Sequence, residues 1–143
     1  MESPVIILGA SGLGKAAKEI FESHGIVIFG FLDDDKSLHG KEIGDVSVLG
    51  STSDAGFLKY IGHKCQAFVA EDNNAARKSI VSMLNEKRKV MPMNAIHSQS
   101  YISTSAHMEH GNFINIGVTI GANAKVGNHC ILHSHAVIAY AAQ

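Results

Sequence analysis

The segment Gly9 to Lys15 joins a short apolar run to a helical pattern. The backbone N–H groups of such a loop, together with the positive end of the following helix, face the place that a ligand phosphate would occupy. The sequence therefore predicts an anion site here, and a turn that serves only tight strand–helix packing is the alternative. The candidate binding residues are Gly9, Ala10, Ser11, Gly12, Leu13, Gly14 and Lys15.

Two well-known phosphate motifs do not fit this loop. Ser11 stands where the dinucleotide pattern G-x-G-x-x-G has a glycine, which disfavours NAD. Ala16 stands where a nucleoside-triphosphate loop has the hydroxyl residue that holds Mg²⁺, which disfavours an ATPase.

Two acidic residues follow the loop at the spacing that nucleotide-binding folds use. Asp33 and Asp34 come after Gly14 by about 20 residues, where α/β nucleotide folds place an acid on the ribose hydroxyls. This spacing favours a nucleotide ligand. A solvated acidic turn is the alternative, and it is the better interpretation for Asp35 and Lys36.

The elements that must position these residues alternate as in a βαβ unit. The sequence predicts a buried strand at 5–8, a helix from 15 to about 23, and a second strand at 26–32, with Gly25 near the C-cap of the helix. A Gly-rich excursion (39–50), a helix around 54–60, a strand at 66–70 and a helix at about 74–86 should follow, the last with N-cap candidates at Asp72, Asn73 and Asn74. The first part is therefore expected to be an α/β module on a short parallel sheet.

Past Pro92 the helical periodicity stops and a six-residue register takes over. Six does not match the 3.6-residue period of a helix, whereas short strands joined by turns have this repeat in the hexapeptide β-helix. The sequence predicts about three coils, which stack at ~4.8 Å; a β-sandwich is the disfavoured alternative. The anchors are Val90, Ile96, Ile102, Met108, Ile114, Ile120, Val126, Leu132 and Ile138, and mostly small residues follow each anchor by four positions.

Composition limits the range of functions. The formal net charge is -1, and the Lys and Arg residues are scattered, so no basic field for nucleic acid or an anionic membrane is expected. No apolar stretch approaches the ~20 residues that cross a bilayer. Cys65 and Cys130 are far apart and no secretory signal precedes the first strand, so a cytoplasmic protein with two free thiols and a small ligand is predicted.

Four stretches together resemble the bacterial nucleotide-sugar acyltransferases, which include sialic-acid O-acetyltransferases and UDP-4-amino-sugar N-acetyltransferases. They are 5–12, 31–35, 48–50 and 114–138. The resemblance implies a Rossmann-like βαβ domain (residues 1–89) that binds a UDP- or CMP-sugar, then a left-handed parallel β-helix (90–143) that holds acetyl-CoA as co-substrate. It also implies a homotrimer with sites between protomers.

In such enzymes a solenoid histidine, oriented by an adjacent carboxylate, removes a proton from the acceptor. Here the corresponding positions hold Tyr140 and Ala141. A phenol with a pKa of ~10 is a poor base at neutral pH. His133 and His135 are the candidate substitutes, and an exposed polar wall is the alternative. A metal site at these two and His129 is disfavoured, because no Cys or carboxylate completes it.

The register ends near Gln143, whereas members of the resembled family continue for several coils. The chain is therefore expected to be truncated or to have its open edge covered by a neighbour. The predicted function is acetyl transfer from acetyl-CoA to an amino or hydroxyl group of a nucleotide-sugar in glycan or surface-polysaccharide biosynthesis. A non-catalytic nucleotide-sugar-binding or assembly subunit, or a fragment of the enzyme, is the alternative.

Overall fold

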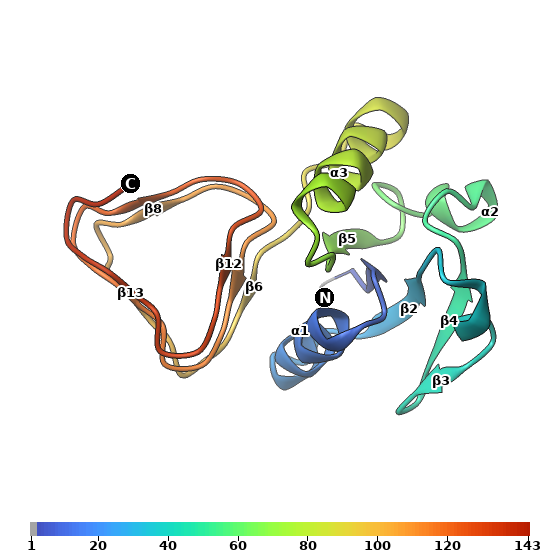
Figure 1. Cartoon of the computed structure of the whole chain (residues 1–143), viewed down its shortest axis with the longest axis horizontal. Helices are drawn as coiled ribbons and strands as arrows, with labels where there is room; N and C mark the ends of the chain where they lie inside the picture. Colours follow the sequence, from blue (N-terminus) through green and yellow to red (C-terminus); the bar gives the residue numbers. More distant parts are fainter. Residues whose placement is uncertain (1–2) are drawn as a thin grey trace. The chain divides into compact units, whose positions relative to one another are not determined.

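The computed structural model describes residues 3–143, and its chain divides after Pro92 into two compact units. The first unit is an α/β domain (Figure 1). Its elements are β1 (Val5–Leu8), α1 (Gly12–Ser23), β2 (Ile28–Leu32), the 3₁₀ turn η1 (Lys36–Leu38), β3 (Glu42–Ile43), β4 (Val46–Gly50), α2 (Ala55–Leu58), β5 (Gln66–Val69) and α3 (Asn74–Arg88).

These strands form one mixed sheet in the order β3-β4-β2-β1-β5. β4, β2, β1 and β5 run parallel, and β3 is antiparallel to β4. Figure 1 shows α1 on one face of the sheet and α2 and α3 on the other. Both faces of β1 are therefore covered, which explains why all four of its residues are buried.

Most of the elements predicted for this unit are present, with corrections at two places. α1 begins at Gly12, so Gly12 to Gly14 belong to the helix rather than to the preceding turn. The Gly-rich excursion contains the hairpin of β3 and β4, which was not predicted. Its signal in the sequence was the alternation of Val46, Ser47 and Val48, which matches the alternating burial of β4.

The caps of the helices follow the predicted chemistry. Gly25 has a φ of 77° just beyond α1, and its N–H donates to the Glu22 carbonyl at 2.9 Å. Asn73 is the N-cap of α3, and its side-chain oxygen accepts from Ala76 N–H at 2.9 Å.

The second unit, residues 93–143, consists of two-residue strands that stack in three parallel sheets. Figure 1 shows it as a triangle. Strands eighteen residues apart pair directly, as in Ile96 with Ile114 and Ile114 with Leu132, so a coil takes three hexads. The strands are β6 (Ala95–Ile96), β7 (Tyr101–Ile102), β8 (His107–Met108), β9 (Phe113–Ile114), β10 (Thr119–Ile120), β11 (Lys125–Val126), β12 (Ile131–Leu132) and β13 (Val137–Ile138).

The predicted large–small pairing forms the core of this unit. Ile114, Val118, Ile120 and Ala124 are buried together, and the anchors of the neighbouring coils pack against them. Val90 is a correction: it lies in no strand and packs instead against the core of the first unit. The structural register therefore begins at Ile96.

The corners of the solenoid repeat a left-handed backbone conformation every six residues. Positive φ values between 56° and 74° occur at Gly111, Gly117, Asn123, His129, His135 and Ala141. Glycine is needed where coils stack closely, because a Cβ on Gly117 would overlap the His135 ring of the next coil.

Candidate functional site

The carboxyl ends of the parallel strands share one edge of the first unit, and the predicted loop lies there. In open α/β sheets ligands bind in the crevice outside this edge, where the strand order reverses. β1 lies between β2 and β5, so the order reverses at β1. The loop that follows β1 is therefore in the expected position.

Two glycines of this loop are required by packing. Gly9 has a φ of 121°, and a Cβ there would overlap the carbonyl oxygen of Ala70 after β5. A Cβ on Gly14 would overlap the carbonyl oxygen of Gly9. These glycines bring β1, α1 and β5 into close contact, as the packing interpretation expects.

Gly12 differs from them. It is exposed at the start of α1, and a Cβ built on it would have no neighbour within 4 Å. The fold therefore does not require a glycine at this position. Ser11 and Lys15 are also exposed, whereas Ala10 and Leu13 are buried.

Asp33 joins the loop to the end of β2. Its Oδ2 accepts from Ala10 N–H at 2.8 Å, and its Oδ1 accepts from Asp35 N–H at 2.8 Å. A carboxylate offers about four lone-pair sites, so acceptor capacity remains for a further donor. The neighbouring Asp35 accepts two hydrogen bonds from Ser37, which lower the pKa of its carboxyl.

Asp34 contacts the end of β4 instead. Its carboxylate accepts from both the backbone N–H and the hydroxyl of Thr52, each at 2.9 Å. Thr52 is buried, and sequence reasoning missed it because the hairpin that brings it beside β2 was not predicted. The two aspartates thus tie β2 to the strands on either side.

A cleft of about 280 Å³ opens beside Asp34. Its volume is slightly below the range of about 300–1,000 Å³ that small-molecule sites usually have, so it suits part of a ligand such as one ring. The Gly9–Lys15 loop does not line it. The lining residues are Asp34, Thr52, Ser53, Glu71, Ala76, Ser79, Ile80 and Met83.

Arg77 of α3 holds the loop that borders this cleft. Its guanidinium donates to the carbonyl oxygens of Glu71 (2.9 Å) and Asp72 (3.2 Å) and to the side chain of Asn74. Sequence reasoning missed Arg77, although an arginine four residues after an N-cap was a usable signal. It positions the carboxyl end of β5.

We expect Arg77→Ala to lower the free energy of unfolding by about 2 kcal/mol, because two backbone carbonyls lose a charged donor. The matched control is Lys78→Ala, an exposed neighbour on the same helix, which should change it by less than about 0.5 kcal/mol. Urea denaturation measures both, and equal effects would contradict the assigned role.

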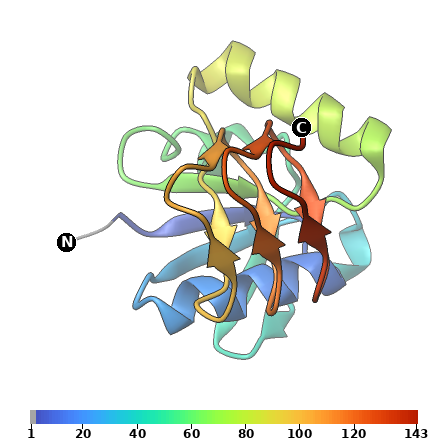
Figure 2. The same cartoon turned by 90° about the vertical axis from the view of Figure 1, so that its left-hand side faces the viewer.

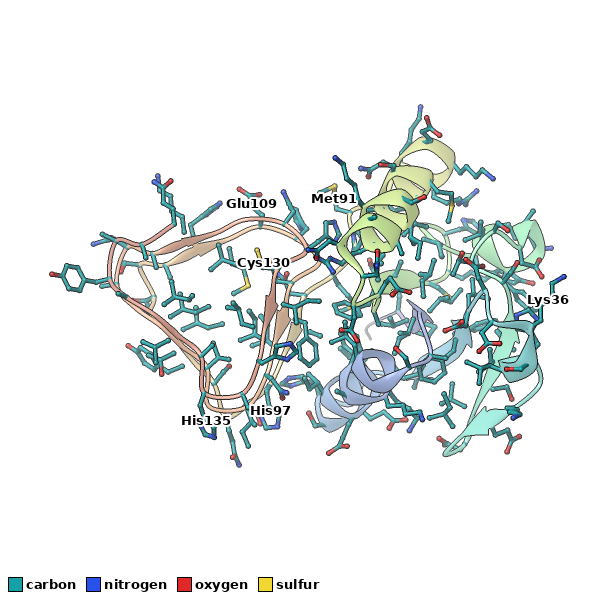
Figure 3. All side chains as sticks on the ribbon, in the orientation of Figure 1. Lys36, Met91, His97, Glu109, Cys130 and His135 are labelled. Carbon is teal, nitrogen blue, oxygen red and sulfur yellow. The ribbon has the colours of Figure 1, made fainter. Side chains whose placement is uncertain are left out.

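In the solenoid, the candidate histidines His133 and His135 lie at a different corner from Tyr140. His133 follows β12 in the column of Asn115 and His97, and Figure 3 shows His97 and His135 outside the same corner. Tyr140 lies beyond β13 at the following corner, with its side chain 79% exposed. The histidines therefore do not occupy the position of Tyr140.

One histidine–carboxylate pair was not predicted. His107 Nε2 lies 2.8 Å from Glu109 Oε1 on an exposed face at β8, and Lys125 pairs with His107 in the next coil. Figure 3 shows Glu109 pointing out of the triangle. Among residues 3–143, no three His, Cys, Asp or Glu side chains gather so that they could hold a metal ion.

The fold and the edge site together define an α/β domain joined to a parallel β-helix. Similar solved structures share this fold. The acetyltransferase domain of PglB from Neisseria gonorrhoeae, in complex with acetyl coenzyme A, is 22% identical with a TM-score of 0.84. PerB from Caulobacter crescentus, in complex with CoA and GDP-perosamine, is 23% identical with a TM-score of 0.82. WeeI from Acinetobacter baumannii is 20% identical with a TM-score of 0.80.

The comparisons cover nearly all of this chain but only part of those proteins. The matches span 98%, 98% and 96% of the chain and 66%, 64% and 64% of the PglB domain, PerB and WeeI, respectively. The PglD N-terminal domain matches residues 4–84, which is more than half of the chain. The chain therefore belongs to the family of the PglD N-terminal domain. No curated protein matches it.

Proposed function

We propose that the first unit binds a nucleotide-sugar at the carboxyl edge of its sheet. The observation that carries this proposal is Gly12, a glycine that the fold does not need at the exposed start of α1. A missing side chain there lets a pyrophosphate approach the helix N-terminus, where N–H groups and the helix dipole favour an anion. Asp33 and Asp34 would then accept from the ribose hydroxyls.

The reaction proposed for the chain is acetyl transfer to an amino or hydroxyl group of that sugar. The acceptor atom attacks the thioester carbonyl of acetyl-CoA, the new C–N or C–O bond forms, and the C–S bond breaks. The acceptor proton passes to an imidazole and then to the leaving thiolate. PerB, whose structure holds CoA and GDP-perosamine, supports this substrate class, and His133 and His135 are the candidate bases.

A second candidate function is a non-catalytic nucleotide-sugar-binding or assembly subunit. The observation that favours it is the exposed Tyr140 with Ala141, since a phenol is a weaker general base than an imidazole and an alanine side chain has no polar group that could orient one. Tyr101, Thr119 and Val137 form an uncharged column on the outer face of β7, β10 and β13. Tyr101 and Val137 are 62% and 71% exposed, so this face would suit the contact between protomers of a trimer.

Two measurements on the full chain separate these functions. Titration calorimetry with UDP-, CMP- and GDP-sugars should give saturable heat with one of them, and no heat with any would overturn the binding proposal. Release of free CoA from acetyl-CoA and the bound sugar nucleotide should exceed a blank if the chain catalyses transfer. If only binding is found, Tyr140→His with Ala141→Asp tests a lost base, because CoA release should then appear.

Within the described part of the chain, no helix has both the length and the apolar character that crossing a bilayer requires.

A further inference from the structure

Two segments far apart in the sequence bring positive charge to the amino edge of the first unit's sheet. Residues 59–65 and 85–91 contain five of the 12 Lys and Arg of the chain but only one of its 13 Asp and Glu, Glu86. Figure 2 shows the C-terminal end of α3 and the loop before β5 on the same side of this domain. These two segments therefore carry an excess of positive charge, although the net charge of the whole chain is -1.

Arg88 holds the two segments together. Its Nε donates to the Ile61 carbonyl and its terminal nitrogen to the Lys59 carbonyl, both at 2.9 Å. Because this guanidinium is occupied by backbone, the exposed cations that these two segments present are Lys59, Lys64, Lys87 and Lys89.

Exposed apolar side chains adjoin these lysines. Val27 and Phe29 at the start of β2 are 68% and 42% exposed. The Phe29 ring lies 5.5 Å from the Tyr60 ring, and Lys59 Nζ lies 5.3 Å from the same Tyr60 ring. The Tyr60 ring thus connects the exposed Phe29 to the basic segments. We call Val27, Phe29, Lys59, Lys64, Lys87 and Lys89 the amino-edge surface.

We propose that the amino-edge surface docks on an anionic lipid bilayer. Lysine is a mobile point charge on a flexible stem, which suits a fluid array of phosphate headgroups, whereas rigid carboxylate partners favour the planar fork of arginine. Each lysine near an anionic leaflet adds favourable binding energy, and exposed Val and Phe side chains can enter the headgroup boundary. Sequence reasoning missed this basic field because its lysines meet only in the fold.

The opposite edge gives the docking a direction. Asp33, Asp34, Glu71 and Asp72 lie at the carboxyl ends of the strands. An anionic leaflet repels these acids while it attracts the lysines, so the cleft beside Asp34 would face solvent and stay open to a soluble ligand. This proposal does not depend on the proposed function.

The test is co-sedimentation of the full chain with vesicles of phosphatidylcholine alone or with 30% phosphatidylglycerol. Binding should require phosphatidylglycerol and weaken as salt rises. The variant K59Q/K64Q/K87Q/K89Q should bind at least a hundredfold more weakly, at about fivefold per lysine. V27S/F29S should lose the binding that remains at high salt.

The matched control is K36Q/K41Q/K78Q/K125Q, which removes the same charge from exposed lysines elsewhere. It should keep most of the vesicle binding, and circular dichroism should show all variants folded. Equal loss in both quadruple variants, or no binding of the unaltered chain to either vesicle, would overturn the proposal. Tighter binding to poly-aspartate than to vesicles would also overturn it and assign the surface to an acidic protein.

Discussion

Gly9→Ala is expected to cost about 4 kcal/mol of folding free energy, which is close to the whole stability of a small domain. Gly9 has a φ of 121°, which strains any residue with a side chain. The added Cβ would also overlap the Ala70 carbonyl, and backbone on both sides would have to move. The first unit should therefore lose cooperative unfolding, as measured by circular dichroism in urea.

Gly12→Ala is the matched control, and the contrast with Gly9 tests the nucleotide-sugar site. The new methyl group meets nothing within 4 Å, and alanine is the better helix former, so stability should stay the same or rise by about 0.5–1 kcal/mol. Affinity for the sugar nucleotide should nevertheless fall about tenfold or more, because the methyl group would stand where the proposed site holds the pyrophosphate.

Calorimetry that finds unchanged affinity for a folded Gly12→Ala protein would place the ligand elsewhere and leave the loop as a packing turn. A Gly12→Ala protein that unfolds like Gly9→Ala would show that the exposed position carries a structural constraint.

The solenoid could be predicted from the sequence because its repeat is a fixed spacing of aliphatic residues along the chain. One aliphatic residue in six recurs from Ile96 to Ile138, and each anchor is the second residue of a strand. Val90 also falls on the six-residue register, yet its side chain packs against the core of the first unit. A single aliphatic residue can pack equally well in either unit, so the sequence pattern predicts the repeat but not the residue at which it begins.

The candidate site was predictable only in part, because its contacts join distant segments. The loop and Asp33 could be named from strand–turn–helix spacing. Thr52 could not, since its role depends on which strand ends are adjacent in the sheet. Arg77 bonds within its own segment, and its place four residues after the N-cap was the signal that could have named it. Glycines look alike in sequence, and only the positions of neighbouring atoms separate Gly9 and Gly14 from Gly12.

A buried amide ladder at one corner of the solenoid carries the second large effect. Asn112 is fully buried, and its side chain accepts from Cys130 N–H at 2.7 Å and donates to the Gly127 carbonyl at 2.8 Å. Asn94, one coil earlier, accepts from Asn112 N–H at 2.8 Å in the same way. Cys130 takes the equivalent position in the next coil, where its side chain lies inside the triangle (Figure 3). A thiol cannot replace the two strong hydrogen bonds of an amide, so the ladder ends there.

Asn112→Ala should therefore lower the free energy of unfolding by about 3 kcal/mol, since the Cys130 N–H and the Gly127 carbonyl each lose the partner that the buried amide supplies. Sequence pattern alone predicts the opposite, because alanine suits the small inward position.

Asn128→Ala in the same coil is the control. Asn128 is exposed and its side chain accepts from His110 N–H at 3.0 Å, so water can replace this hydrogen bond at a cost below about 1 kcal/mol. Urea denaturation gives both energies, and hydrogen exchange at Cys130 should accelerate only in the first variant. Equal losses would mean that the amide ladder adds nothing beyond side-chain volume, and the stability of the corner would then rest on the aliphatic stack.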